Sequence, residues 1–555
     1  MKTSLFAVGV LALSHGAFAQ QPPPTAGGQL QQIPPAPAPE RAAPEIIIEK
    51  RGAPPRPGGE EVKVVVSALR ITGAKVYPEA ELAALTGFEP GSELSLIELR
   101  ALAAKIAAYY HRNGYFVAKV YLPAQDIQGG TVTFAVVEGE YGKVSVRNQA
   151  NLAERIPGGL LEGLNTGDTI AIAPLETRLL LLSDIPGVTV RSTLVPGASV
   201  GTSDLIVDVT PGQRVTGSVE LDNAGDRYTG EWRVGGTVNV NNPSGNGDVV
   251  SLRALTSGSG LVYGRAAYQI ALGRATVGVA YTSLHYRLGE EFESLRAHGT
   301  AQIASVYASY PLIRSRNTNL YAVTGFDAKT FEDKADATST VVDKNVGVGM
   351  AGLYGNHRDS FAGGGFNSYS LTASVGRVDI ETPAARVVDA ATARSNGGYG
   401  KLGFTASRLQ TVTRTVSLYG AVFGQVASQN LDISEKLVLG GAYGVRAYPA
   451  GETYFDEGYV ATLEARLLLP KFWERVPGQM HAIAFVDTGT ATLHKEPWAA
   501  GANHRTLSGA GIGITWAEYN NFALRAYYAH KLGNAKAISA PDSSGRAWLQ
   551  LVKYF

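Results

Sequence analysis

The feature that most constrains the fold of this chain is the alternation of apolar and polar residues in short segments of residues 214–555. In one segment, Leu463, Ala465 and Leu467 alternate with polar neighbours. This period of two is typical of β-strands with one apolar face. After the first 20 residues, no stretch approaches the ~18 uncharged apolar residues that a membrane-spanning helix needs. The chain is therefore predicted to be mainly β, and a helical membrane protein is excluded.

Composition bears on which kind of β protein this is. Only 17% of the residues are charged and 65 of 555 are Gly, against ~25% and ~7% in average proteins. Together with 26 Tyr, these values indicate a transmembrane β-barrel, in which only every second residue meets lipid. A soluble β-sandwich would also alternate, so the rest of the chain has to distinguish the two.

The turn residues between alternating segments give a count of strands. Sixteen candidate strands begin near residues 214, 229, 247, 261, 274, 297, 317, 338, 366, 397, 411, 457, 477, 503, 519 and 544. A closed antiparallel bacterial barrel requires an even number. Because barrels of this size leave an aqueous lumen, the barrel could admit an extended polypeptide. Residues 214–555 are therefore predicted to form a 16-stranded antiparallel transmembrane β-barrel.

The first 60 residues predict a signal for export, followed by a linker. Residues 1–19 combine a positive charge at Lys2, a short apolar core and a small-residue cleavage site, the pattern of a secretory signal peptide. Residues 20–60 hold 11 of the 27 prolines, a density that favours extended segments over packed structure. Within this Pro-rich linker, residues 44–51 could form a short helix or an added strand.

Two smaller units are expected between the linker and the barrel, at residues 61–141 and 142–213. In the first unit, strands are expected at 62–71, 115–122 and 131–138, and helices at 78–85 and 95–113. In the second, strands are expected at 143–147, 188–194 and 204–210, and helices at 152–164 and from 174 onward. Ser95 and Glu98 form a capping box at the start of the longest helix. Both units are therefore predicted to be small α+β modules with a β-α-α-β-β plan.

Three stretches of the first unit resemble POTRA domains, the periplasmic modules of the BamA-like outer-membrane superfamily. They are residues 71–73, 110–115 and 132–139. The resemblance implies that the two units stand in the periplasm and receive unfolded polypeptide there. Strand addition to an exposed sheet edge is a mode that suits such recognition. On the pattern alone, a generic α+β binding domain is the alternative.

A motif in the longest gap between expected strands resembles a signature of two-partner secretion transporters, the TpsB family of haemolysin secretion/activation proteins. Val445, Arg446 and Tyr448, preceded by Gly444, match the Val-Arg-Gly-Tyr tip of that family's sixth extracellular loop, with Ala447 in the Gly position. The resemblance implies that the loop, residues 429–457, folds back into the lumen of the barrel.

A second signature of the same family, Phe-x-Asp-x-Gly, is matched by Phe485, Asp487 and Gly489 on an expected strand. These three residues share one face of the strand, so Asp487 points inward if all three do. The resemblance implies that Arg446 reaches Asp487. A guanidinium makes a fork-shaped, charge-assisted bond to a carboxylate, so the pair is expected to act as a latch between loop and barrel.

Three further features bear on this resemblance: the first barrel hairpin, the C-terminal residue and the segment before the first POTRA-like unit. The first hairpin of the barrel, residues 217–230 and 241–248, also resembles that of the family. The C-terminal Phe555 resembles the signal that the barrel-assembly machinery reads, although Lys553 occupies a position that is more often apolar. Many family members carry a plug helix before the first POTRA domain. Here the prolines predict either a short plug around residues 45–51 or none.

Several classes of function are excluded by what the sequence lacks. The nine His show no metal-binding spacing, Cys is absent, and no phosphate loop or nucleophile elbow stands in context. No catalytic residue, cofactor or metal is therefore expected. The formal net charge of +1 gives no excess of basic residues that would favour nucleic acid as a partner.

The resemblance and the residues together predict an outer-membrane translocase that secretes one partner exoprotein by two-partner secretion. Three partners are expected. They are that exoprotein, which is bound unfolded, the lipid of the outer membrane, and the barrel-assembly machinery during biogenesis. The translocase is expected to be a monomer. The alternatives are a BamA-like assembly factor, against which two POTRA units argue, and a passive porin, which would leave those units unexplained.

Overall fold

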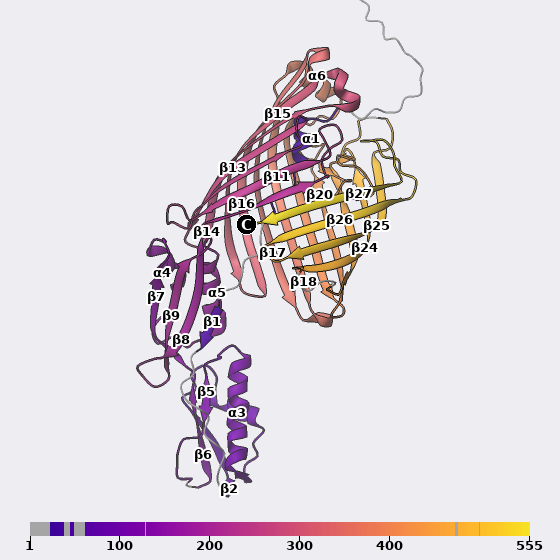
Figure 1. Cartoon of the computed structure of the whole chain (residues 1–555). Coiled ribbons are helices and arrows are strands. Elements are labelled where there is room, and N and C mark those ends of the chain that lie inside the picture. Colours follow the sequence, from indigo (N-terminus) through magenta and orange to yellow (C-terminus); the bar gives the residue numbers. More distant parts are fainter. Residues whose placement is uncertain (1–22, 38–44, 49–61, 128, 472–475, 499) are drawn as a thin grey trace, which may run out of the picture.

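The computed structural model describes residues 23–37, 45–48, 62–127, 129–471, 476–498 and 500–555, so the expected signal peptide lies outside the described residues. The chain forms a barrel and two small α+β units that follow one another from one end of it (Figure 1). Among the described residues, no helix is long and apolar enough to cross a bilayer.

Sixteen strands close into one barrel, in which each strand pairs antiparallel with its neighbours. Their bounds are β10 (Val215–Asp222), β11 (Arg233–Asn241), β12 (Val249–Thr256), β13 (Leu261–Leu272), β14 (Ala275–Arg287), β15 (Ala297–Arg314), β16 (Thr318–Ala335), β17 (Thr340–Asp359), β18 (Gly365–Ile380), β19 (Gly397–Thr411), β20 (Val416–Ala427), β23 (Glu457–Leu468), β24 (Gln479–Thr492), β25 (His504–Glu518), β26 (Phe522–Leu532) and β27 (Gly545–Tyr554). The predicted closed 16-stranded antiparallel barrel is confirmed.

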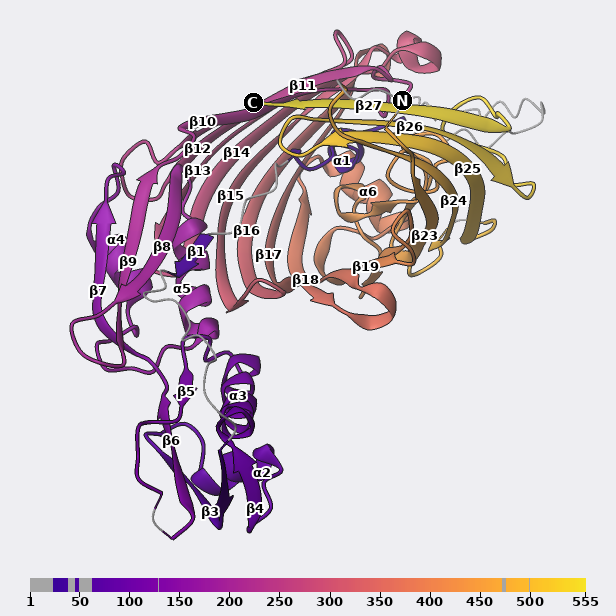
Figure 2. The same cartoon turned by 60° about the horizontal axis from the view of Figure 1, so that its bottom comes forward.

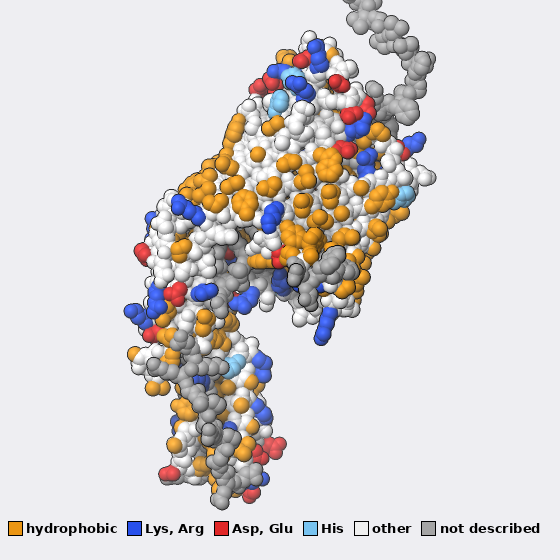
Figure 3. Space-filling model, in the orientation of Figure 1, with side chains coloured by type: hydrophobic (Ala, Val, Ile, Leu, Met, Phe, Trp, Pro, Cys, Tyr) orange, Lys and Arg blue, Asp and Glu red, His pale blue; other side chains and the backbone are white. Residues whose placement is uncertain are grey.

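The alternation along each strand separates an apolar outer face from a polar inner one. Leu252 and Leu463 are 55% and 60% exposed, whereas their neighbours Arg253 and Glu464 are buried. Hydrophobic side chains cover much of the outer wall of the barrel, and most charged ones lie toward its ends (Figure 3). An apolar band outside and charge inside is the arrangement that a lipid bilayer requires.

The last residues of the chain close the barrel. β27 pairs with β10 from Asp222↔Gln550 to Ser218↔Tyr554. Beyond this ladder, the backbone N–H of Phe555 donates to Gly217 O at 3.1 Å, and Gly217 N–H donates to Phe555 O at 2.9 Å. Phe555 is 52% exposed on the outer side of this seam.

Short helices cap the connections between barrel strands. They are η1 (Glu290–Leu295), η2 (Asp336–Thr338), η3 (Phe361–Gly363) and α6 (Pro383–Ala391). α6 lies at the end of the barrel that is remote from the two α+β units (Figure 1).

The first α+β unit packs two helices against a small sheet. β2 (Lys63–Val66) pairs with β4 (Ser92–Ser95), and β3 (Ala68–Thr72), β6 (Thr131–Val137) and β5 (Lys119–Tyr121) form a sheet in the order β3-β6-β5. The helices are α2 (Glu79–Thr86) and α3 (Leu96–Arg112). The Ser95–Glu98 capping box is present, with bonds of 2.7 and 3.2 Å. Leu99, Ile106 and Tyr110 of α3 are buried against the sheet.

The second unit contains β7 (Glu140–Asn148), α4 (Arg155–Leu161), α5 (Ile172–Ser183), β8 (Val188–Pro196) and β9 (Thr202–Pro211). β7 begins two residues before the expected boundary at 142, because Gly139, with a φ of 85°, already turns the chain out of β6. The sheet order is β1-β8-β9-β7, in which β1 (Glu45–Ile48) is an added parallel strand.

The two units are packed directly on each other. Only Glu138 and Gly139 separate β6 from β7. The Glu138 carboxylate accepts hydrogen bonds from the backbone N–H groups of Lys75 and Val76 and from the Tyr110 hydroxyl, at 2.7–2.8 Å. Across the junction, Ile172 N–H donates to Gly114 O at 2.9 Å. The connection is therefore short, bonded to the first unit through Glu138 and crossed by a backbone bond to the second.

The second unit is also fixed to the end of the barrel. Arg314, at the end of β15, makes two bonds of 2.7 and 2.8 Å to Asp184. Arg316 pairs with Glu176 at 2.6 Å. On another strand connection, Asn242 donates to Asn151 O at 2.6 Å. The α+β units therefore form an arm with several attachments to the barrel.

A short helix, α1 (Ala26–Gln31), lies inside the barrel (Figure 2). The expectation of a continuous linker over residues 20–60 is wrong at this point, and so is the expectation of a plug at residues 45–51 or none. The helix avoids the prolines, since it ends before Pro34 and is capped by the Thr25 side chain, which accepts from Gly28 N–H. Residues 45–48 instead take the alternative of an added strand, as their three successive Ile favour.

Candidate functional site

The lumen of the barrel holds a long connection between β20 and β23, residues 428–456, which we call the lumen loop. It includes η4 (Ile433–Glu435) and the paired strands β21 (Leu437–Val438) and β22 (Tyr454–Phe455). Its apolar side chains pack on inward residues of the wall, among them Val460, Ile483 and Leu507. The loop therefore folds into the barrel and not outward from it.

Arg446, at the tip of the lumen loop, lies against Asp487 on the inner face of β24. Its Nε and Nη2 donate to the two carboxylate oxygens at 2.8 Å each, and its backbone N–H donates to Oδ2 at 3.1 Å. Thr462 donates to the same carboxylate at 2.9 Å. Arg446 is 6% exposed and Asp487 is fully buried. The pair has the bidentate geometry that fixes both position and orientation.

Further wall residues complete the environment of Arg446. Its Nη1 donates to Glu464 at 2.9 Å, and Glu464 also pairs with Arg466 at 2.7 Å. The guanidinium carbon lies 3.5 Å from the centroid of the Phe485 ring and 5.0 Å from that of Tyr527. Burial alone would lower the pKa of Arg446, but its bonds with Asp487 and Glu464 raise it. The loop tip is thus held by charge, hydrogen bonds and cation–π contact together.

The other residues of the loop motif shape its tight packing. A Cβ at Gly444 would lie 2.3 Å from Leu439 O, so the backbone approaches too closely there for any side chain. Val445 and Tyr448 are fully buried, and the Tyr448 hydroxyl donates to Ala535 O at 3.1 Å. Gly489 on the wall leaves room for Leu439, which would lie 2.6 Å from an added Cβ.

Ala447 occupies the position where the family signature has Gly, and the structure shows how it fits. Ala447 is fully buried and its φ is not positive, so the turn does not require Gly. Its Cβ lies against Gly509 of β25, where an added Cβ would come within 2.5 Å. Gly509, on the wall strand that faces the loop, thus leaves the space that the side chain of Ala447 fills.

A second anchor holds η4 of the lumen loop to other strands of the wall, and sequence reasoning missed it. Lys344 of β17 bonds both oxygens of Asp432 at 3.0 and 2.8 Å. Lys329 of β16 and Lys401 of β19 pair with Glu435 at 2.6 and 2.9 Å. Burial alone would raise the pKa of Glu435, but the attraction of Lys401 and Lys329 outweighs it and lowers the pKa. Alternation places each of these lysines on the inner face of its strand, but the sequence does not show that they meet at the lumen loop.

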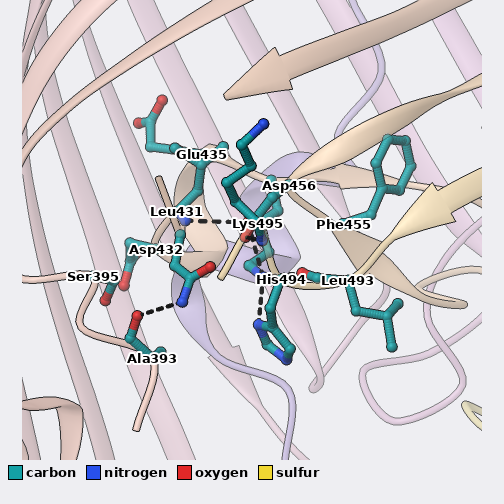
Figure 4. Close-up of polar contacts among 12 residues, drawn as sticks. Ala393, Ser395, Leu431, Asp432, Glu435, Phe455, Asp456, Leu493, His494 and Lys495 are labelled. Atoms are coloured by element: carbon teal, nitrogen blue, oxygen red, sulfur yellow. Dashed lines mark hydrogen bonds and ion pairs between the residues drawn. The ribbon is translucent and has the colours of Figure 1, made fainter. Parts of the chain in front are cut away.

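The start and end of the lumen loop are joined by Asp456 (Figure 4). Its carboxylate accepts from the backbone N–H of Leu431 at 3.1 Å and of Lys495 at 2.9 Å. Lys436 pairs with the same carboxylate at 2.9 Å. Burial lowers the pKa of Lys436, and the carboxylate of Asp456 opposes that shift. The loop is therefore tied to the connection between β24 and β25 as well as to the wall.

α1 lies between η4 and the wall, and its helix surface fits both. A Cβ on Gly27 would lie 2.8 Å from Ser434 Cβ, so helix and loop touch through backbone. The Gln31 side chain donates to Ser434 O. At the start of the helix, Ala26 N–H donates to Asp333 of β16 at 2.7 Å.

The polypeptide that leaves α1 is held by two inward arginines. Arg233 donates to Gln32 O at 3.1 Å, and Arg253 donates to Pro34 O at 2.7 Å. Each arginine is also paired with a buried carboxylate, Asp222 for Arg233 and Glu220 for Arg253. Polar contacts thus surround the helix and the residues that follow it. A cavity beside Arg446 has a volume of about 530 Å³.

Comparison with known proteins supports a specific family. The family model described as haemolysin secretion/activation protein ShlB/FhaC/HecB matches residues 201–516, and the ShlB-type POTRA model matches residues 64–139. The heme/hemopexin transporter protein HuxB of Haemophilus influenzae strain 86-028NP is 28% identical over 485 residues, which cover 86% of this chain and 84% of HuxB.

Solved structures share the fold. The structure of CdiB from Escherichia coli superposes with a TM-score of 0.68 at 21% identity, over 91% of this chain and 93% of CdiB. A BamA from Haemophilus ducreyi superposes with a TM-score of 0.53 at 15% identity, over 89% of this chain and all of that one. Since the first family model spans more than half of the residues, the chain belongs to the haemolysin secretion/activation protein ShlB/FhaC/HecB family.

Proposed function

We propose that this chain is an outer-membrane translocase that recognises one partner exoprotein and secretes it by two-partner secretion. Its family is that of haemolysin secretion/activation proteins, and HuxB carries the name of a transporter. The observation that carries the proposal is the lumen itself, which is filled by two elements, α1 and the lumen loop, held by side-chain contacts that can be broken. A barrel filled in this way can open for an extended chain and close again.

The fold suggests a direction for this transport. The two α+β units stand in the periplasm and bind the exoprotein unfolded, and the end that carries α6 faces the cell surface. Folding of the exoprotein outside would then favour its outward movement without ATP. The translocase acts as a monomer, surrounded by lipid, and uses no cofactor or metal.

Within this mechanism, the Arg446–Asp487 pair is the latch that sets the position of the lumen loop. Gly444, Val445 and Tyr448 give the loop tip its compact shape, and Phe485 and Gly489 provide the surface that receives it. Since bidentate bonding fixes the orientation of the loop, the latch defines the shape of the channel through which the exoprotein passes.

The proposed function is tested by deleting this gene. If a large exoprotein is encoded beside it, we would measure that protein in the medium and on the cell surface, together with total barrel-protein levels. Dedicated secretion predicts loss of that one cargo while other barrels stay intact. Unchanged export with a general loss of barrel proteins would instead identify an assembly factor, a function that the shared BamA fold leaves to be tested.

Removal of Phe555 is expected to lower the amount of this protein in the outer membrane several-fold. The residue closes the seam with Gly217 and exposes its ring on the outer face, where the assembly machinery can read it. Quantitative immunoblots of membrane fractions measure the effect. Phe555→Tyr keeps the aromatic ring and serves as the matched control, and normal levels of the truncated chain would exclude Phe555 as an assembly signal.

A further inference from the structure

Two arginines on the inner wall of the barrel hold the chain that leaves α1 by its main-chain carbonyls. Arg233 of β11 donates to Gln32 O at 3.1 Å, and Arg253 of β12 donates to Pro34 O at 2.7 Å. The two carbonyls lie two residues apart, and residues 33–37 have no regular secondary structure. Because every residue has a carbonyl, contacts of this kind do not depend on the side chains of the bound segment.

The bound segment uses only part of what a polypeptide main chain offers. Pro34 and Pro35 have no backbone N–H, so at these positions the main chain presents carbonyls alone. A guanidinium group carries five N–H donors and no acceptor, which suits such a segment. A segment without Pro presents N–H groups as well, and its full binding requires acceptors beside the arginines.

The same wall contains acceptors and further donors that have no hydrogen-bond partner among the described residues. These atoms are Glu220 Oε2, Asp222 Oδ2, Arg233 Nη2, Arg253 Nε, Ser218 Oγ and Thr237 Oγ1. Each of the six side chains is at most 8% exposed. Since an unpaired buried polar group costs free energy, their concentration on three neighbouring strands indicates a ligand that supplies both donors and acceptors.

The strand register arranges these groups with the repeat of an extended chain. Asp222 of β10 is the partner of Arg233 on β11. Four residues along β11, Thr237 is the partner of Arg253 on β12, and Glu220 stands between these two rows. Successive inward positions of a strand are ~7 Å apart, which is also the distance between alternate residues of an extended polypeptide. One extended segment can therefore meet donors and acceptors at successive steps.

Cavities border this stretch of wall on both sides. One of about 340 Å³ lies beside Pro34 and is lined by Thr237 and Arg253. Asp222 lines the cavity of about 530 Å³ beside Arg446. The lumen therefore has space next to the polar groups of the wall.

We propose that the inner wall of β10–β12 is a binding site for the main chain of the exported protein in extended form. Arg233 and Arg253 donate to its carbonyls, and Glu220 and Asp222 accept from its N–H groups. The inference rests on the proposed function and names the atoms of the cargo that the lumen binds. Because these atoms recur at every residue, the site accepts each part of a long cargo in turn.

The first test neutralises the wall without leaving a buried charge unpaired. The variant D222N/R233Q/E220Q/R253Q replaces both ion pairs with amides. At equal barrel levels it is expected to export the exoprotein at least ~10-fold less than wild type, because hydrogen bonds to charged groups are the stronger kind. The matched control D359N/R408Q removes a partly exposed ion pair of 2.7 Å between the end of β17 and β19, and it should export normally.

Conductance in planar bilayers separates this role from that of a simple anchor. If the arginines only held the chain after α1, their loss would free the lumen, so conductance would rise and export would be unchanged or higher. That result would overturn the proposal, and so would reduced export with lowered conductance, since the lumen would then have narrowed. Reduced export with unchanged or raised conductance supports the proposal.

A milder variant decides the question if the fourfold variant does not reach the membrane. Arg253→Lys keeps the charge beside Glu220 but lacks the fork with which Arg253 reaches Glu220 through Nη2 and a carbonyl through Nη1. Export at normal barrel levels is expected to fall several-fold. Export equal to wild type would contradict the proposed binding site.

The last test asks which part of the cargo the wall binds. The two probes are the exoprotein and a version in which a stretch of its exported part is replaced by alternating Gly and Ser. Binding of the main chain predicts that the fourfold variant, or Arg253→Lys in its place, lowers export of both by the same factor. A loss confined to the natural exoprotein would show that the wall binds side chains and would refute the inference.

The same cells also test the proposed function separately. Wild-type export of the natural exoprotein decides whether the chain is a secretion protein. Its absence would overturn the proposed function, and this inference with it. Given that export, the wall variants test the main-chain site alone.

Discussion

Replacing Arg446 with Ala is expected to reduce export of the exoprotein at least tenfold while the barrel still inserts into the membrane. The change leaves the carboxylate of Asp487 fully buried without its cation, and it removes one of the two arginines at Glu464. Breaking a buried ion pair from one side costs about 3–5 kcal/mol. The loop tip would therefore leave the wall, while the β-ladder that closes the barrel stays intact.

The measurement compares exported cargo with the amount of inserted barrel. Arg446→Lys keeps the charge but cannot make the two-pronged bond, so an intermediate loss is expected. Lys334→Ala removes a half-exposed ion pair with Glu332 on β16 and is the matched control, for which no change is expected. Wild-type export by the Arg446→Ala protein at normal barrel levels would rule out the latch.

The second large effect is expected at Gly27, where Leu should open the channel. An added Cβ would meet Ser434 Cβ at 2.8 Å and Ser434 Cα at 3.1 Å, and neither atom belongs to a flexible side-chain end. Leu ranks just below Ala as a helix former, whereas Gly is less favourable than Ala by roughly 0.8–1 kcal/mol, so the helix itself does not suffer. The collision therefore forces α1 away from η4, and ion flow through the lumen should increase several-fold.

Conductance of the purified protein in planar bilayers measures this opening. Gly264→Leu is the matched control, because no atom lies within 4 Å of a Cβ there. Val262, two residues earlier and on the same face of the strand, is exposed on the outer wall. An unchanged conductance for Gly27→Leu would mean that α1 does not close the lumen. The uptake of a large antibiotic by cells that carry each variant provides an independent readout.

Much of the barrel could be predicted because each strand carries its own signal. The exposed Leu463 and the buried Glu464 show the alternation that lipid outside the wall and a polar lumen inside it impose. Turn residues separate one strand from the next. α1 carries no such signal. A six-residue helix with two Gly is too short to be stable alone, so its contacts in the lumen determine it.

The candidate site was predictable only where two motifs identified it. Arg446 and Asp487 stand in recognisable signatures, although they lie 41 positions apart. Lys329, Lys344 and Lys401 lie on three separate strands, and they come together only through closure of the barrel and the path of the lumen loop. Ordinary charged residues on different strands give no local pattern from which such a meeting could be inferred.

The short junction at Glu138 and Gly139 sets the distance between two sheet edges of the arm. The two units are joined by two residues and hydrogen-bonded across the junction, so the structure sets one spacing between the edges of β5 and β8. A polypeptide that engages both edges must carry two strand-forming segments separated by a connection long enough to bridge that spacing. Chains with a shorter connection can hold one edge at a time, so the arm would select its cargo by segment spacing as well as by sequence.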